Sequence, residues 1–161
     1  MQKYKLFLDL DGVLADFDHA VFALFGESPE SIHPARMWSR LAKTPDFYAH
    51  LLWMEDGRIL WDAVSHLQPT ILTGLPRGTW AESQKREWCA RELGPEVPVI
   101  TCMSRDKHLQ AAETRSNGLT PVLVDERGSL AEKWESAGGI FIHHRSARES
   151  IEELKRYSVL G

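Results

Sequence analysis

The chain has 161 residues, which suffices for one hydrophobic core and a small insertion but not for two full domains. Hydrophobic residues make up 43% and charged residues 26%, as in ordinary globular proteins. The net charge of −4 provides no attraction for a nucleic-acid polymer or an anionic membrane surface. No apolar stretch approaches the length that crosses a bilayer, so we expect neither a membrane nor a nucleic-acid polymer as partner.

The two cysteines, Cys89 and Cys102, can form one disulfide at most, and a chain of this size has enough core to need none. We expect both to be reduced thiols. Near the N-terminus, Asp9 and Asp11 interrupt what would be the apolar region of a signal peptide. These features together predict a cytoplasmic protein.

The first predicted element is a short buried strand in the apolar run of residues 4–8, which leads directly into two acids. Alternation along a strand places Asp9 and Asp11 on the same side, and Gly12 allows a sharp turn just after them. Two like charges this close repel, so the pair implies a bound cation, a shared proton or both. The alternative is that the acids cap a helix beginning near Val13, for which a single acid is enough.

Residues 16–67 form a segment that is mostly helical in pattern and rich in large aromatic side chains. Prolines interrupt it at Pro29, Pro34 and Pro45. We predict a small helical cap over the edge of a sheet, with residues 1–15 and 68–161 as the core. The alternative is a helical layer with its own small core, in which most of the rings are buried.

Further short β-like runs follow, each separated from the next by room for a helix. They are Pro69–Leu72, Val97–Cys102, Pro121–Val124 and Gly139–Ile142. Strands that alternate with helices predict an α/β fold with a parallel sheet covered on both faces. The histidines His143 and His144, just after the last run, are expected at the surface.

Three helices are predicted between and after these runs, at Thr79–Leu93, Ser129–Ala137 and Ser146–Tyr157. The first carries Trp80, Gln84, Trp88 and Arg91 at helical spacing and stops before Gly94-Pro95. In the last, Ser146 and Glu149 have the spacing of a capping box.

Four polar residues lie at or just after predicted strand ends: Asp9, Thr73, Cys102 and Asp125. The carboxyl ends of parallel strands meet at one edge of the sheet, where open α/β folds bind their ligands. We therefore expect these residues to converge on one site.

Four segments, in this order, resemble the haloacid dehalogenase (HAD) superfamily of phosphohydrolases. They are Asp9-Leu10-Asp11-Gly12-Val13, Ile71-Leu72-Thr73-Gly74, Lys107 and Val122-Leu123-Val124-Asp125-Glu126. The resemblance covers nearly the whole chain and implies the Rossmann-like fold of that superfamily, with a cap inserted after the first strand. It also implies a phosphomonoesterase that works through an aspartyl-phosphate.

The resemblance assigns a role to each acid. Asp9 is the nucleophile that attacks phosphorus, and Asp11 is the acid that protonates the leaving group and then the base that activates water. Mg²⁺ is the expected metal, since hard oxygen ligands and a phosphoryl group favour it. Asp9, the main-chain carbonyl of Asp11, and Asp125 are its expected ligands, whereas Glu126 acts through water or not at all.

The same resemblance places phosphate-binding groups at Thr73, Gly74, Arg105 and Lys107, with the lysine neutralising the charge of the transferring group. Each also has an ordinary structural explanation. Thr73 then caps a strand end, Lys107 belongs to a solvated charged loop, and Arg105 pairs with its neighbour Asp106. By the same reasoning, Asp125 begins the turn that follows its strand.

Within the superfamily, residues 9–17 are similar to the 5′(3′)-deoxyribonucleotidases, as is the segment Arg105-Asp106-Lys107. This implies a nucleoside monophosphate as substrate, with Phe17 against the nucleobase and Trp38 and Phe47 as further cap contacts. In those enzymes a serine stands where this chain has Gly74, so one hydroxyl is missing here. Residues 108–117 also lengthen the distance from Lys107 to the fourth motif, and are expected to form an extra helix or a lid.

Other functions stay open at this point. The substrate can be another small phosphorylated metabolite, such as a sugar phosphate. A non-catalytic signalling module, similar to response-regulator receiver domains, also carries an aspartate that accepts a phosphoryl group on a parallel sheet. A binding protein that has kept the fold without the activity is a third alternative.

Overall fold

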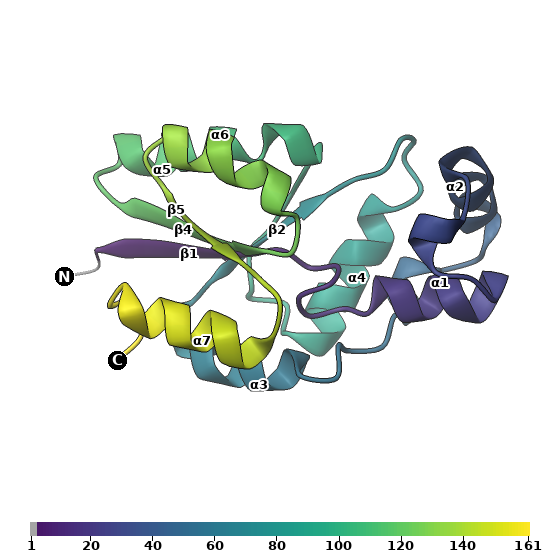
Figure 1. Ribbon diagram of the computed structural model, residues 1–161, viewed down its shortest axis with the longest axis horizontal. Helices are drawn as coiled ribbons and strands as arrows, with labels where there is room; N and C mark the ends of the chain where they lie inside the picture. The colour runs from purple at the N-terminus through teal and green to yellow at the C-terminus, as the bar shows by residue number, and fades with distance from the viewer. Residues whose placement is uncertain (1–2) are drawn as a thin grey trace.

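The computed structural model describes residues 3–161, so that Met1 and Gln2 of the predicted core lie outside the described residues. Its centre is one parallel sheet with the strand order β3-β2-β1-β4-β5 (Figure 1). The strands are β1 (Tyr4–Leu8), β2 (Thr70–Gly74), β3 (Val99–Cys102), β4 (Thr120–Asp125) and β5 (Ile140–His143). The prediction of an α/β fold with a parallel sheet is therefore confirmed.

Within residues 3–161, seven α-helices connect or surround the strands. They are α1 (Phe17–Phe25), α2 (Pro34–Lys43), α3 (Gly57–Val64), α4 (Glu82–Glu92), α5 (His108–Ser116), α6 (Ala131–Ser136) and α7 (Ala147–Arg156). Short 3-10 turns lie at Pro29–Ser31, Tyr48–His50, Ser65–Leu67, Ser104–Asp106 and Gly128–Leu130. None of the helices in the described part of the chain is both long enough and apolar enough to span a membrane.

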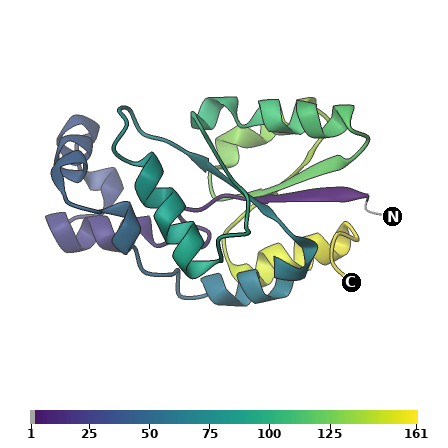
Figure 2. The same ribbon diagram turned by 180° about the vertical axis from the view of Figure 1, so that it is seen from behind.

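The two faces of the sheet are covered by different helices, because side chains alternate along each strand. Leu6 and Leu8 of β1 join a core that includes side chains of α3, α4 and α7. Phe7 points to the other face, where its ring meets the Trp134 indole edge to face at 5.6 Å between centroids, beneath α5 and α6. Figures 1 and 2 show α5 and α6 on one side and α3 and α7 on the other.

The helices α1 and α2 lie away from the sheet, at the end of the molecule opposite the N-terminus (Figure 1). The predicted cap ends at residue 67, but α3 packs beside α7 against the core. The boundary of the cap at residue 67 stays a prediction. The apolar stripe of α3, with Leu60 and Val64 fully buried, explains why this helix joins the core layer.

Of the two expectations for the segment 108–117, a helix or a lid, the helix is confirmed: it is α5, which connects β3 to β4 and packs on β4. Around α4 the buried residues are Ala81, Lys85, Trp88 and Cys89, and only Trp88 is also one of the residues at the predicted helical spacing. A lysine of α4 therefore lies in the core.

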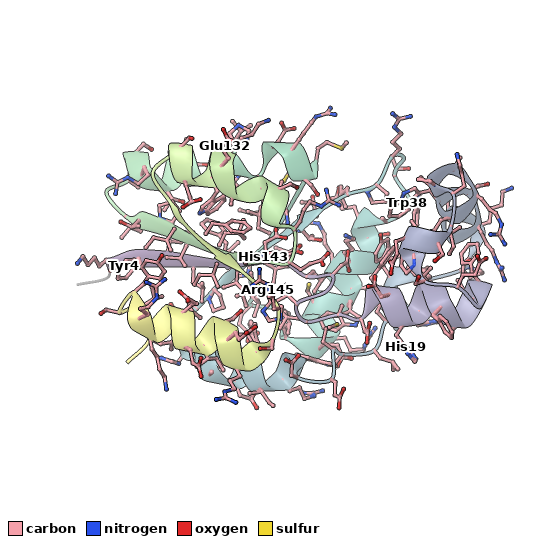
Figure 3. All side chains as sticks on the ribbon, viewed as in Figure 1. Tyr4, His19, Trp38, Glu132, His143 and Arg145 are labelled. Carbon is pink, nitrogen blue, oxygen red and sulfur yellow. The ribbon has the colours of Figure 1, made fainter. Side chains whose placement is uncertain are left out.

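The ends of the chain are tied to the core by local contacts. Tyr4, at the start of β1 in Figure 3, donates a hydrogen bond from its hydroxyl to the carbonyl of Tyr157 at 3.1 Å. At the start of α7, the amide of Glu149 donates to Ser146 Oγ at 3.1 Å, as the capping motif predicts. Both cysteines are free thiols, as expected, and burial raises the pKa of Cys89 to about 12.

The expected surface position of His144 is wrong. His143 is exposed, but the His144 ring is buried at 5% exposure and its Nδ1 lies 2.6 Å from Ser150 Oγ of α7. The backbone amide of His144 also donates to the Asp125 carbonyl, which turns its ring inward beneath α7. Burial lowers the pKa of His144 below its usual value of 6.5.

We therefore expect His144 to make the fold sensitive to acid. The unfolded chain takes up this proton more readily than the folded protein, so its contribution to the free energy of unfolding is full above pH 6.5 and decreases as the pH falls toward the folded-state pKa. In urea unfolding, the stability advantage of the wild type over His144→Asn should be smaller at about pH 5.5 than at about pH 7.5. His143→Asn, at the exposed neighbouring histidine, serves as a control. If the difference in unfolding free energy between wild type and His144→Asn were the same at both pH values, the expectation would be contradicted.

Candidate active site

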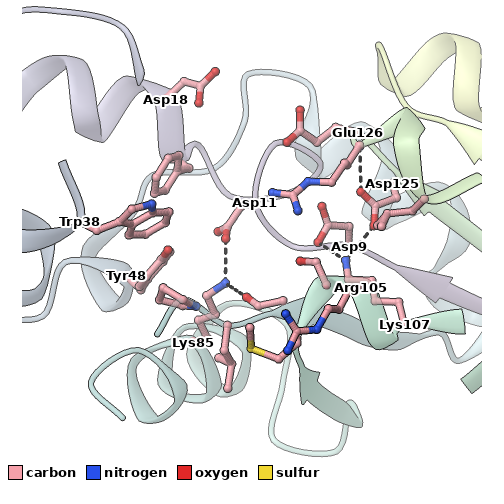
Figure 4. Close-up of a pocket in the computed structure, with 18 residues that line it drawn as sticks. Asp9, Asp11, Asp18, Trp38, Tyr48, Lys85, Arg105, Lys107, Asp125 and Glu126 are labelled. Atoms are coloured by element: carbon pink, nitrogen blue, oxygen red, sulfur yellow. Dashed lines mark hydrogen bonds and ion pairs between the residues drawn. The ribbon is translucent and has the colours of Figure 1, made fainter. Parts of the chain in front are cut away.

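The carboxyl ends of the strands form one wall of a cleft of about 410 Å³ (Figure 4). At its floor Lys107 Nζ lies 3.0 Å from Asp9 Oδ1 and 2.7 Å from Asp125 Oδ2. Asp9 follows β1, Asp125 ends β4, and Lys107 lies between the turn after β3 and α5. Three separate connections of the sheet thus meet in one ion-paired group, which contains Asp9 and Asp125, two of the four strand-end residues expected to converge.

This ion-paired group is almost free of solvent, with Lys107 exposed by 3% and Asp125 by 1%. Burial opposes the charge of Lys107, but the facing carboxylates of Asp9 and Asp125 outweigh it and raise the pKa of the lysine. Burial and the charge of Asp9 raise the pKa of Asp125. The interpretation of Lys107 as part of a solvated loop is therefore wrong.

The second acid, Asp11, faces a different lysine. Lys85 Nζ of α4 donates to Asp11 Oδ2 at 2.8 Å, to Thr73 Oγ1 at 3.0 Å and to the carbonyl of Gly74 at 2.6 Å. Asp11 Oδ1 is buried and has no hydrogen-bond partner within residues 3–161. Burial, with the charge of Asp9, raises the pKa of Asp11, although Lys85 works in the opposite direction.

Thr73 occupies a different place from the one predicted. It is fully buried in β2, it does not line the cleft, and its hydroxyl accepts from Lys85. A direct bond from this hydroxyl to phosphate stays a prediction. Cys102, at the end of β3, also does not line the cleft.

The turn after β1 depends on Gly12. Its φ of +82° is a conformation that residues with a side chain rarely adopt, and an added Cβ would come within 2.8 Å of Glu126 Cγ. The amide of Gly12 donates to the Ala15 carbonyl, while the amides of Leu14 and Ala15 donate to Leu10. These bonds close a tight loop that holds the two acids at the strand end.

A hydroxyl from another loop lies beside Gly74 at the end of β2. A side chain on Gly74 would overlap Ser104 Oγ, which occupies that space beside the end of β2. Ser104 begins the turn after β3 and lines the cleft. Sequence reasoning did not single it out, since only the tertiary fold brings residues 74 and 104 together.

The opposite wall of the cleft is aromatic and comes from the cap. Phe17 and Trp38 line it, as predicted, with ring centroids 5.8 Å apart, and Figure 3 shows Trp38 on the side of α2 that faces the core. Tyr48 was not predicted; its ring stacks on Phe17 at 6.0 Å and also lines the cleft. Phe47 lies behind this wall at 5% exposure and does not line the cleft.

The mouth of the cleft carries charged side chains. Arg105 is exposed there and lines the cleft, and no ion pair joins it to Asp106 in the described chain. Glu126 and Arg127 are also exposed and line the cleft. The backbone amide of Arg127 donates to Asp125 Oδ1 at 2.9 Å and fixes that carboxylate.

The donors at the floor suit a hard cation such as Mg²⁺. The carboxylates of Asp9 and Asp125 face one another across Lys107, and both supply oxygen atoms. No group of three or more acidic, histidine or cysteine side chains that could hold a metal ion occurs within residues 3–161. Mg²⁺ commonly takes one or two carboxylates and completes its shell with water and phosphate oxygens, so this donor set fits it.

Solved structures show the same fold with little sequence similarity. A hydrolase from Streptococcus pneumoniae TIGR4 aligns with 99% of this chain and 100% of its own, at a TM-score of 0.56 and 14% identity. At this identity the likeness establishes the fold and leaves the activity to be argued from the site. No protein-family model matches the sequence, and no curated protein matches it.

Two further structures align less closely, both at a TM-score of 0.49. One is a HAD family enzyme from Bacteroides thetaiotaomicron in complex with magnesium, with 12% identity over 91% of this chain and 95% of that one. The other is a HAD family hydrolase from Deinococcus radiodurans R1 with bound phosphate and sodium, with 14% identity over 98% and 97% of the two chains. At these scores they add nothing to the fold assignment.

The close approach of Gly74 and Ser104 can be tested by stability. The methyl group of Gly74→Ala would overlap Ser104 Oγ, so we expect a loss of about 1–3 kcal/mol in the free energy of unfolding. The double variant Gly74→Ala/Ser104→Ala removes the overlapping oxygen and should recover most of that loss. Equal losses in the two backgrounds, measured by urea denaturation, would contradict this arrangement.

Proposed function

We propose that the protein is a Mg²⁺-dependent phosphomonoesterase of the HAD superfamily that acts through an aspartyl-phosphate on Asp9. The proposal rests on one observation. Asp9 follows the central strand of the sheet, and its carboxylate is paired with a buried lysine at the floor of the cleft. A second carboxylate, that of Asp11, lines the same cleft within two positions of the first.

In the first step, a carboxylate oxygen of Asp9 attacks phosphorus opposite the ester oxygen. The new bond joins Asp9 to the phosphoryl group, and the bond from phosphorus to the leaving oxygen breaks. Asp11, in its protonated form, donates its proton to that leaving oxygen, so the alcohol departs neutral. Lys107 holds Asp9 in place and offsets negative charge on the transferring group.

In the second step, Asp11 is the base. Its carboxylate takes a proton from a water molecule, and the resulting hydroxide attacks phosphorus of the aspartyl-phosphate. The bond from phosphorus to the Asp9 oxygen breaks, which releases inorganic phosphate and restores both acids to their starting forms. Arg105 and Ser104, at the cleft wall, are placed to bind the phosphoryl oxygens.

The metal in this proposal is held by Asp9, Asp125 and the main-chain carbonyl of Asp11. When bound, Mg²⁺ neutralises charge on the phosphoryl oxygens and orients the group for in-line attack. Glu126, exposed above Gly12, supports the site through water. The free thiols also fit a cytoplasmic location, which we propose with the activity.

The preferred substrate in our proposal is a nucleoside monophosphate. A cleft of about 410 Å³ falls within the usual range for small-molecule sites. The rings of Phe17, Trp38 and Tyr48 line it across from the acids, and flat aromatic faces suit a nucleobase. A nucleobase offers this aromatic wall a larger flat surface than a sugar ring does.

Phosphate release from a panel of nucleoside monophosphates and sugar phosphates tests the activity and the substrate together. We expect release with Mg²⁺, loss of release with EDTA, and a preference for one group of nucleotides. Asp9→Asn keeps the shape of the side chain but removes the nucleophile, so it should reduce the rate at least about 10³-fold.

Each other result points to one alternative. Equal rates on sugar phosphates would overturn the nucleotide assignment and retain the phosphatase. A phosphorylated protein that persists for many minutes without release would favour the signalling module, and no release or phosphorylation from any substrate would favour a binding protein. Normal turnover by Asp9→Asn would overturn the mechanism.

The aromatic wall predicts a separate effect on affinity. Phe17→Ala and Trp38→Ala should each raise KM for the best nucleotide about 10-fold with little change in kcat, because stacking on a base contributes about 1–3 kcal/mol. Phe22→Ala is the matched control, since Phe22 lies on the same helix as Phe17 and is 57% exposed outside the cleft. An unchanged KM in both cap variants would remove the base from this wall.

A further inference from the structure

A buried lysine that the mechanism does not use lies beside the proposed acid. Lys85 is 1% exposed on the inner face of α4, one turn before Trp88 and Cys89. Taking an ammonium group out of water is expensive, and such a group persists only where paired charges and hydrogen bonds offset the cost. The contacts of Lys85 therefore indicate what it does.

Every proton of this ammonium has an acceptor. A lysine has three N–H donors, and Lys85 uses them on Asp11 Oδ2, Thr73 Oγ1 and the carbonyl of Gly74. The ring of Tyr48 covers the ammonium with its centroid 4.5 Å from Nζ. No donor remains for a phosphoryl oxygen, which separates Lys85 from phosphate-binding groups such as Arg105.

The two oxygens of Asp11 are unlike one another for this reason. Oδ2 is fixed by Lys85 at 2.8 Å, whereas Oδ1 is buried and has no partner in the described chain. A buried carboxylate oxygen without a partner is costly unless a ligand or a proton completes it. Oδ1 is thus the atom available to hold and transfer a proton.

We propose that Lys85 is a positioning residue that ties Asp11 to the end of β2 through Oδ2, so that Oδ1 alone exchanges protons with the leaving oxygen and with water. This inference rests on the proposed phosphomonoesterase activity. Lys85 lines the cleft, but its three donors are taken by Asp11, Thr73 and Gly74, so in this proposal it acts through Asp11 and not on the substrate. It joins the loop after β1 to the end of β2, two parts of the sheet that must stay in register for the acid to reach its target.

The role of Lys85 can be tested with substrates whose leaving oxygens differ in basicity, because a more basic leaving oxygen depends more on protonation by Asp11. Phenyl phosphate and 4-nitrophenyl phosphate have nearly the same shape, but phenolate is a much more basic leaving group and needs protonation more. The kcat/KM value reports the steps up to formation of the aspartyl-phosphate. We use the ratio of kcat/KM for phenyl phosphate to kcat/KM for 4-nitrophenyl phosphate. We expect Lys85→Met to lower this ratio about 10-fold or more, because general acid catalysis typically contributes 10²–10⁴-fold.

Controls separate positioning from general support of the fold. Asp11→Asn should lower the ratio in the same way, and Lys155→Met, at an exposed lysine of α7, should leave it unchanged. A merely structural role would lower both kcat/KM values of Lys85→Met by the same factor and leave their ratio at the wild-type value, which would overturn the proposal.

A second comparison applies even where Lys85→Met does not fold. In Asp11→Asn/Lys85→Met no charge is left unpaired, and the ratio should equal that of Asp11→Asn, because Lys85 acts through Asp11. A further decrease of the ratio in the double variant would overturn the proposal. Wild-type protein that releases phosphate neither from these esters nor from any substrate of the nucleotide and sugar-phosphate panel would instead overturn the proposed function, and the positioning role with it.

Discussion

The ammonium of Lys107, held between the carboxylates of Asp9 and Asp125, is the interaction on which the rest of the site depends. Two acids at adjacent ends of a sheet, both nearly inaccessible to water, would repel one another and the fold. One lysine from the connection after β3 offsets that cost for both. It also fixes the ends of β1 and β4 to the start of α5, which makes the floor of the cleft rigid.

A second lysine, Lys85, pairs with the other acid, Asp11. Asp11 is paired with Lys85 from α4, while Asp9 is paired with Lys107, so the two acids are held from opposite sides of β1. Carboxylates only two positions apart thereby occupy different environments. Such a difference is what a nucleophile and an acid–base partner require, since one must stay ionised while the other exchanges a proton.

The cap adds a wall of a different kind. Its rings stack on one another and on Trp80, which follows β2, so the aromatic wall reaches from the cap to the core. The floor carries charge and the opposite wall carries flat apolar surface. A ligand that fills both must itself have a charged end and a flat body, which is the argument for a nucleotide in preference to a sugar phosphate.

The sequence by itself determined the α/β class, the parallel sheet and the edge at which the polar residues meet. Asp9 and Asp125 were found because they lie at the ends of short apolar strands, and parallel strands present their carboxyl ends together. Asp11 was found because it follows Asp9 by two positions and so lies on the same side. Phe17 was found through the resemblance of residues 9–17 to a known family. These signals come from short stretches of sequence and from topology, and need no knowledge of packing.

Only the tertiary structure decided which helix face and which loops complete the site. Lys85 was missed because a lysine on the inner face of a helix is identified only once its acceptors are known. Ser104 fills the space left by Gly74 through a contact across 30 positions of sequence. Phe47 and Tyr48 are adjacent aromatics, yet only Tyr48 lines the cleft, because the backbone turn that begins between them directs the two rings differently.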